Sequence, residues 1–140
     1  MRRKRDITTR EIKKHKARLN IDGSRMVKSR DYDLTYAPVA KWATIKLLLG
    51  LTPIQNWHTV QLDYVLAFTQ APVERELYMK IPKGFEVEGG KNEDYCFKLH
   101  KNTYGQKQAG RVWNKYLVTK LKKIGFQQSV VDECVSTKEK

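Results

Sequence analysis

The feature that most constrains the fold is a stripe of large apolar side chains late in the chain, spaced three or four residues apart. The stripe consists of Trp113, Tyr116, Leu117, Leu121 and Ile124. This spacing predicts an amphipathic helix over residues 111–124, with most lysines of the segment away from the apolar face. Gly125 follows the last apolar position, where glycine commonly ends a helix.

Two segments upstream alternate apolar and polar residues with the period of a β-strand. Val60 and Leu62 alternate with polar residues within 58–68, and Leu77 and Met79 do so within 77–81. The further predictions are strands over 16–21 and 95–99, a largely buried helix over 42–51 that ends before Pro53, irregular structure over 24–40 and an exposed loop over 86–94. Together these patterns predict a mixed class of helices and strands.

The charge of the chain is large and unevenly placed. Its formal net charge is +13, from 28 basic and 15 acidic residues. Residues 1–46 carry 14 basic and 5 acidic side chains, residues 47–97 carry 4 and 7, and residues 98–140 carry 10 and 3. Two basic blocks favour a polyanionic partner, because neutralised phosphates release counterions. Charge alone does not separate nucleic acid from anionic lipid, and a solubilising basic surface is the alternative.

Several other classes of protein are not expected. The longest apolar stretch, residues 45–51, is interrupted by Lys46 and Gly50, so no membrane-spanning helix is predicted. The basic start of the chain has no apolar segment after it, unlike a signal peptide, and we expect an intracellular protein that is not secreted. Cys96 and Cys134 are too few for a disulfide framework or a structural zinc site.

Asp63 is the one acidic residue whose position suggests chemistry, because it lies near the end of the strand predicted over 58–68. An acid at a strand end is more often a surface residue or a cap than a metal ligand. His58 and His100 have no partner at metal-ligand or catalytic-triad spacing. No glycine-rich phosphate loop, nucleophile elbow or zinc signature occurs. The residues alone therefore indicate a basic module with a candidate acidic site.

Four stretches, taken in order, resemble the copia-type retrotransposon reverse transcriptases. They are His15-Lys-Ala-Arg-Leu19; Asp31–Val39 with Ile45–Leu49; Trp57–Phe68 with Ala71–Glu74 and Leu77–Phe85; and Lys98–Trp113. The resemblance covers residues 13–135. It implies an α+β fold, the fingers and partial palm of a reverse-transcriptase-like polymerase, with packed helices on an incomplete antiparallel sheet. We expect a basic arm over 1–14 and this partial domain over 15–140.

The resemblance also implies an activity and its cofactors. The family carries out template-directed nucleotidyl transfer with two Mg²⁺ ions, or Mn²⁺, because phosphoryl transfer needs its developing charge neutralised. By motif position, Asp63 is the first of three metal-binding aspartates, and the backbone carbonyl of Tyr64 also faces the metal. The implied partners are an RNA template, a DNA primer, a deoxynucleoside triphosphate and the remainder of a Pol polyprotein, in a cytoplasmic particle or the nucleus and without a membrane.

Four further residues take nucleotide-binding roles from the resemblance. Phe68 corresponds to the aromatic gate that excludes a ribose 2′-hydroxyl. Lys16 and Arg18, two apart on a predicted strand, correspond to residues that grip the triphosphate. Gln108 corresponds to a glutamine near the nucleotide and the template.

The sequence also departs from the family pattern. Gln106 replaces a usual leucine, and Gly110 replaces a usual proline, which would loosen the entry into the following helix. No Tyr-x-Asp-Asp motif occurs, and Asp132-Glu133 matches the segment before that motif rather than the motif itself. We therefore expect a fragment that is inactive alone. The alternative is a non-catalytic basic nucleic-acid-binding module or a degenerate transposon relic.

Overall fold

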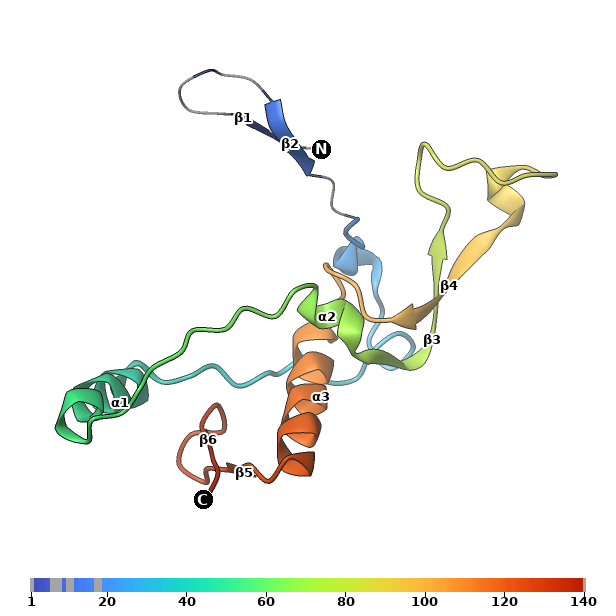
Figure 1. The fold of residues 1–140 in the computed structure, drawn as a ribbon. Helices are drawn as coiled ribbons and strands as arrows, with labels where there is room; N and C mark the ends of the chain where they lie inside the picture. The colour runs from blue at the N-terminus through green and yellow to red at the C-terminus, as the bar shows by residue number, and fades with distance from the viewer. Residues whose placement is uncertain (1, 6–8, 10–11, 17–18, 140) are drawn as a thin grey trace.

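Short antiparallel hairpins and helices alternate along the chain (Figure 1), in a computed structural model that describes residues 2–5, 9, 12–16 and 19–139. The strands are β1 (Arg2–Arg5), β2 (Ile12–Lys16), β3 (Pro72–Lys80), β4 (Cys96–Lys101), β5 (Gln127–Gln128) and β6 (Ser136–Thr137). The helices are η1 (Gly23–Arg25), α1 (Trp42–Ile54), α2 (Ala67–Gln70), η2 (Asn92–Asp94) and α3 (Ala109–Lys123). The strands pair as β1–β2, β3–β4 and β5–β6, each antiparallel. The predicted mixture of helices and antiparallel strands is confirmed.

The helix α3 matches its prediction closely. Ala109 and Val112 are buried on it, and α2 packs against it near the centre of the molecule (Figure 1). At its end the N–H of Gly125 donates to Lys122 O at 3.0 Å, and the N–H of Phe126 donates to Leu121 O at 3.0 Å. This paired closure requires a left-handed residue, which Gly125 supplies with a φ of 91°. The glycine cap is therefore confirmed.

The β3–β4 hairpin confirms the two strands predicted over 77–81 and 95–99, although each begins and ends at different residues. Leu77 pairs with Leu99, and Met79 pairs with Phe97. Leu77 is buried, so the alternating pattern did mark the inward face of this strand. The connection between the strands contains η2, inside the loop that was predicted over 86–94.

The start of helix α1 was predicted correctly, but its end before Pro53 and its burial were not. It runs through Pro53 to Ile54, and none of its residues is buried. The exposed fractions of Trp42, Leu49 and Ile54 are 75%, 62% and 74%. Apolar residues surround this helix on all sides, and in Figure 1 it stands apart from α3 at the end of two extended segments. A helix that is apolar all round normally lies inside a larger core, which the described residues do not form around it.

The strand predicted over 58–68 is wrong. Residues 57–64 have no regular structure, and the apolar side chains of Val60 and Leu62 are 81% and 76% exposed. Leu66 then adopts a left-handed conformation with a φ of 52°, and the short helix α2 follows. Alternation alone does not make a strand, because a strand needs a hydrogen-bonded neighbour. No neighbour is present for this segment in the described part of the chain.

The beginning of the chain also differs from its prediction. The strand expected over 16–21 ends at Lys16 in the structure, and residues 19–22 are irregular. β1 and β2 pair in an antiparallel ladder that begins inside the expected basic arm and extends past its end to Lys16. The boundary between an arm and a domain at residue 14 stays a prediction. No helix of the described residues is long and apolar enough to cross a membrane.

The chain exposes far more surface than a compact domain does. Its accessible surface is 12157 Å², whereas a compact monomer of this mass has about 7,500 Å². The buried apolar residues of the described chain are Ala71, Leu77, Ala109 and Val112. Ala71 follows α2, Leu77 lies on β3, and Ala109 and Val112 lie on α3, which contacts both α2 and β3. These elements form the core of the described structure.

Candidate functional site

Asp63, the candidate catalytic residue, lies in the extended segment between α1 and α2. Its side chain is exposed, and it forms no hydrogen bond or ion pair with the described residues. Both carboxylate oxygens are therefore free to bind a ligand. The sequence predicted that Asp63 lies near the end of a strand. In the structure it lies in an irregular segment, so no sheet fixes its backbone.

The two aromatic residues that follow Asp63 are held against α3 and the turn before it. The ring of Tyr64 meets the ring of Trp113 edge to face at 5.2 Å between centroids. The ring of Phe68 lies 5.0 Å from the ring of Tyr104. Aromatic pairs at such distances stabilise a contact beyond the area that they bury. Tyr64 and Phe68 therefore anchor the segment after Asp63 to the core.

Gln108 is the third predicted site residue near this core. It is the residue before α3, it is 5% exposed, and its side-chain Oε1 is buried without a hydrogen-bond partner. It lines a small cavity of about 130 Å³ together with Glu74, Arg75 and Arg111. A buried amide oxygen with no hydrogen-bond partner is unfavourable, which sets Gln108 apart from the other buried polar side chains that have partners.

The side chains of the two cations predicted to grip a triphosphate, Lys16 and Arg18, lie outside what the structure describes. Lys16 is the last residue of β2, and its backbone pairs with that of Arg2 in β1. Arg18 lies outside the described residues. Their role therefore stays a prediction.

Charged side chains form a network of ion pairs and hydrogen bonds that the sequence did not predict. Arg111 donates to Glu74 at 2.9 Å, and Lys115 lies 3.4 Å from the same carboxylate. Arg75 is paired with Asp33 and donates to the carbonyl of Ser29 at 2.6 Å. These bonds connect α3, β3 and the irregular segment 29–33. Spacing along the chain could not predict them, because they join residues about 40 positions apart.

A buried asparagine links the two strands of the main hairpin to α2. Asn102 is fully buried, and its side-chain nitrogen donates to Pro72 O at 2.7 Å and to Ala71 O at 3.2 Å. Nearby, Gln106 is 6% exposed and accepts from the N–H of Thr103 at 3.0 Å. Gln106 was noted in the sequence only as a departure from the family pattern. In the structure it shapes the turn that leads into α3.

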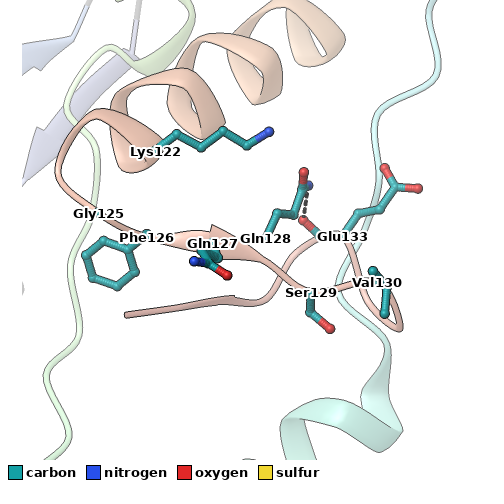
Figure 2. A pocket seen from close by; sticks show the side chains of 8 residues that line it. All are labelled: Lys122, Gly125, Phe126, Gln127, Gln128, Ser129, Val130 and Glu133. Carbon is teal, nitrogen blue, oxygen red and sulfur yellow. Dashed lines mark hydrogen bonds between the residues drawn. The ribbon is translucent and has the colours of Figure 1, made fainter. Parts of the chain in front are cut away.

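Two hollows of the described chain are not lined by Asp63, Tyr64, Phe68 or Gln108. One of about 630 Å³ lies at the carboxyl end of α3, between Lys122, Phe126 and Glu133 (Figure 2). Another of about 610 Å³ follows β3, with Leu77 and Leu99 in its wall. Asp63 and Phe68 line neither. Of the predicted site residues, Gln108 lines the small cavity beside Arg111, whereas Asp63 is exposed on the surface.

The described residues do not fit a two-metal centre by themselves. No group of three or more His, Cys, Asp or Glu side chains that could hold a metal ion occurs among them. Asp63 offers one carboxylate, whereas a pair of divalent ions needs several to offset the repulsion between the ions. No reaction step is therefore derived through a metal held by these residues alone.

The sequence identifies the family. Residues 2–139 match the reverse transcriptase (RNA-dependent DNA polymerase) family, and the chain belongs to it. The chain is 36% identical over 125 residues to the retrovirus-related Pol polyprotein from transposon TNT 1-94 of Nicotiana tabacum, which covers 89% of the chain. It is 37% and 38% identical over 121 residues to the Pol polyproteins from transposons RE2 and RE1 of Arabidopsis thaliana, which cover 86% of the chain. The resemblance to copia-type elements is confirmed.

These matches make the chain part of the reverse transcriptase domain of a transposon Pol polyprotein. The chain spans only 9% of the tobacco polyprotein and 8% of each Arabidopsis polyprotein. Members of this family use divalent metals. No solved structure matches the chain.

Proposed function

We propose that this chain forms the fingers and the first part of the palm of an RNA-directed DNA polymerase from a copia-type retrotransposon. The observation that carries the proposal is the family match, which extends over residues 2–139. The polymerase would copy an RNA template from a DNA primer with deoxynucleoside triphosphates. It would act inside the cell, in a cytoplasmic particle or the nucleus, as part of a Pol polyprotein.

In this proposal Asp63 supplies one carboxylate to a site for two Mg²⁺ or Mn²⁺ ions, and the carbonyl of Tyr64 lies beside it. The free oxygens of Asp63 and the packing of Tyr64 on Trp113 support these roles. The other carboxylates must come from another segment, because no Tyr-x-Asp-Asp motif occurs in these 140 residues. When bound, the ions would neutralise the charge that develops on the transferred phosphoryl group.

Four residues would position the nucleotide. Phe68, held by Tyr104, would exclude the ribose 2′-hydroxyl, and the unpartnered Oε1 of Gln108 would accept a hydrogen bond from the nucleotide or the template. Lys16 and Arg18 would neutralise the triphosphate, because cationic donors form strong hydrogen bonds with phosphate.

The test is a chimaera in which residues 2–139 replace the matching part of the tobacco TNT 1-94 polyprotein. Primer extension should fall roughly a hundredfold or more in Asp63→Asn, since a metal site contributes several kcal/mol to catalysis. The matched control is Asp94→Asn, which changes an exposed aspartate in η2 and should leave extension unchanged. An inactive parent chimaera would contradict the proposed function, and an active Asp63→Asn variant would contradict the role of Asp63.

A second candidate function is a non-catalytic nucleic-acid-binding module. The observation that favours it is the net charge of +13, with exposed lysines along α3. The exposed lysines are Lys115, Lys120, Lys122 and Lys123. This function predicts that binding survives Asp63→Asn, and that the chimaera above does not extend primers.

A further inference from the structure

The amino end of α1 is held by a residue that lies 91 positions later in the chain. The carboxylate of Asp132 accepts a hydrogen bond from the backbone N–H of Lys41 at 3.1 Å, through Oδ2. The side chain of Thr44 lies close enough to the same carboxylate to lower its pKa. Lys41 is the residue immediately before α1, and its own side chain does not cap the helix. Asp132 therefore provides the cap that the local sequence lacks.

The side chain of Lys41 adds a second link, because its Nζ donates to the carbonyl of Val131 at 3.1 Å. We call Asp132, Val131, Lys41 and Thr44 the clasp. Asp132 is only 5% exposed, although it is an acidic residue in a chain with a small core. Hydrogen bonds from Thr44, Cys134 and Lys41 lower the pKa of this carboxyl, so the fold stabilises its charged form.

The turn that carries Asp132 is built to hold this side chain in place. Asp132 Oδ1 accepts from the N–H of Cys134 at 2.9 Å, and its carbonyl accepts from the N–H of Val135 at 2.9 Å. The N–H of Ser129 closes the turn by donating to Val135 O at 2.9 Å, and Gln128 donates to Glu133 O at 2.6 Å. Figure 2 shows this turn at Ser129, Val130 and Glu133, with the segment leading into α1 passing beside it.

The clasp connects two parts of the chain that the proposed function needs near each other. The segment after α1 carries Asp63, and the turn at Asp132 leads into β6. The resemblance to the family implies that the remaining metal-binding aspartates follow this turn. No residue of α1 is buried, so the clasp supplies a fixed point for a helix that has little packing of its own.

We propose that Asp132 is a positioning residue of the polymerase domain: it fixes α1 to the turn 129–135 and so aligns the segments that bring the metal-binding aspartates together. This inference rests on the proposed function, although the clasp itself does not. Glu133, the next residue, is exposed and provides a matched control.

The clasp is tested by amide hydrogen exchange in the 140-residue chain. In Asp132→Ala the amides at the start of α1 should exchange roughly three- to thirtyfold faster, the range that loss of a helix cap produces. Asp132→Asn keeps one carbonyl oxygen, so its amides should exchange at a rate between those of the parent and Asp132→Ala. The amides of Glu133→Ala should exchange at the parent's rate. Equal exchange in Asp132→Ala and Glu133→Ala would overturn the clasp.

A second pair of variants isolates the backbone hydrogen bond. Lys41 has a φ of −72°, which proline adopts without strain. Lys41→Ala removes the bond to Val131, and Lys41→Pro also removes the N–H that Asp132 accepts. Exchange in α1 should be faster for proline than for alanine, and this difference should vanish in the Asp132→Ala background. A difference that persists there would overturn the assignment of this bond.

The positioning role is tested in the chimaera with the tobacco polyprotein. Asp132→Ala should lower kcat for nucleotide addition by roughly three- to thirtyfold, in step with the exchange rates, and leave the KM for deoxynucleotides unchanged. Asp132→Asn should restore part of kcat. Faster exchange with an unchanged kcat would overturn the positioning role but keep the proposed function. An inactive chimaera with intact Asp132 would instead contradict the proposed function and leave the exchange result to decide the clasp.

Discussion

At the scale of single residues, the candidate site combines free and tightly held side chains. Asp63 is exposed and without a partner in the described chain, whereas Phe68 and Gln108 are fixed by the core. Asp31 differs from Asp63, because both oxygens of its carboxylate have hydrogen-bond partners. It accepts from Arg30 twice at 2.9 Å and from the N–H of Val27 at 2.7 Å. These bonds, the one from Arg30 first, lower the pKa of Asp31 to about 2.

The lowered pKa of Asp31 predicts how stability depends on pH. A depressed pKa stabilises the fold above the ordinary value of 3.8, and this contribution is lost as pH falls from there towards 2. Asp31→Asn should therefore be less stable than the parent at pH 7 and lose less stability between pH 4 and 2. Urea unfolding at these pH values measures the difference, with Asp94→Asn as the control. Equal losses in the parent and Asp31→Asn would show that Asp31 contributes nothing specific.

Phe68 allows a test that separates a sugar gate from a packing residue. In the active chimaera, Phe68→Val should admit ribonucleotides, reducing discrimination roughly ten- to a hundredfold, because the ring no longer blocks the 2′-hydroxyl. Tyr104→Leu removes the same ring contact but keeps the Phe68 ring itself, so it should retain more discrimination than Phe68→Val. Incorporation of matched dNTP and rNTP pairs measures both. Unchanged discrimination in Phe68→Val would make the residue part of the core only.

At the scale of elements, the sequence predicted what local rules decide. The stripe from Trp113 to Ile124 and the glycine after it predicted α3 and its cap, because both depend on neighbours within a few residues. Alternation marked β3 correctly but failed at Val60 and Leu62. The two segments have similar patterns, and only β3 has a partner strand in the described chain. Pairing, the burial of α1 and the clasp at Asp132 depend on distant residues, which no local pattern contains.

One contact between distant elements depends on a glycine. The N–H of Ile21 donates to Tyr104 O at 2.8 Å, next to Gly105, which has a φ of 92°. A Cβ at Gly105 would lie 2.0 Å from Ile21 O. Such a clash forces the segment around η1 away from the turn before α3.

Gly105→Ala should therefore destabilise the fold by more than the strain of a positive φ alone, which is about 1–2 kcal/mol. Gly84→Ala is the matched control, because Gly84 has the same φ of 92° and open space around its Cβ position. The midpoint of urea unfolding should fall further for Gly105→Ala. Equal midpoints would mean that the contact between Ile21 and Tyr104 does not stabilise the fold.

At the scale of the whole molecule, charge and exposed apolar surface dominate. The basic blocks predict binding to RNA and DNA that is indifferent to sequence and sensitive to salt. With roughly 4–6 phosphate contacts, log affinity should fall against log salt concentration with a slope of about −3 to −5. Fluorescence anisotropy of labelled oligonucleotides over a salt series measures the slope. A flat titration would show that charge does not drive binding.

The last prediction is that the 140-residue chain does not extend primers by itself. Asp63 cannot hold two divalent ions against their mutual repulsion, and magnesium in particular keeps its waters unless several oxygen ligands replace them. The described residues contain no cluster that could assist it. The residues before Asp63, 57–62, have no regular structure, so no sheet holds its backbone in place.

The measurement is primer extension by the purified chain with magnesium or manganese, compared with Asp63→Asn. The two proteins should give the same background. Template-dependent extension by the parent above the Asp63→Asn variant would contradict the prediction, and would mean that one carboxylate suffices. If the chain is inactive and the chimaera is active, the missing carboxylates and the frame around Asp63 come from the polyprotein. The function of these residues is then to present Asp63, Phe68 and Gln108 to a site that a second segment completes.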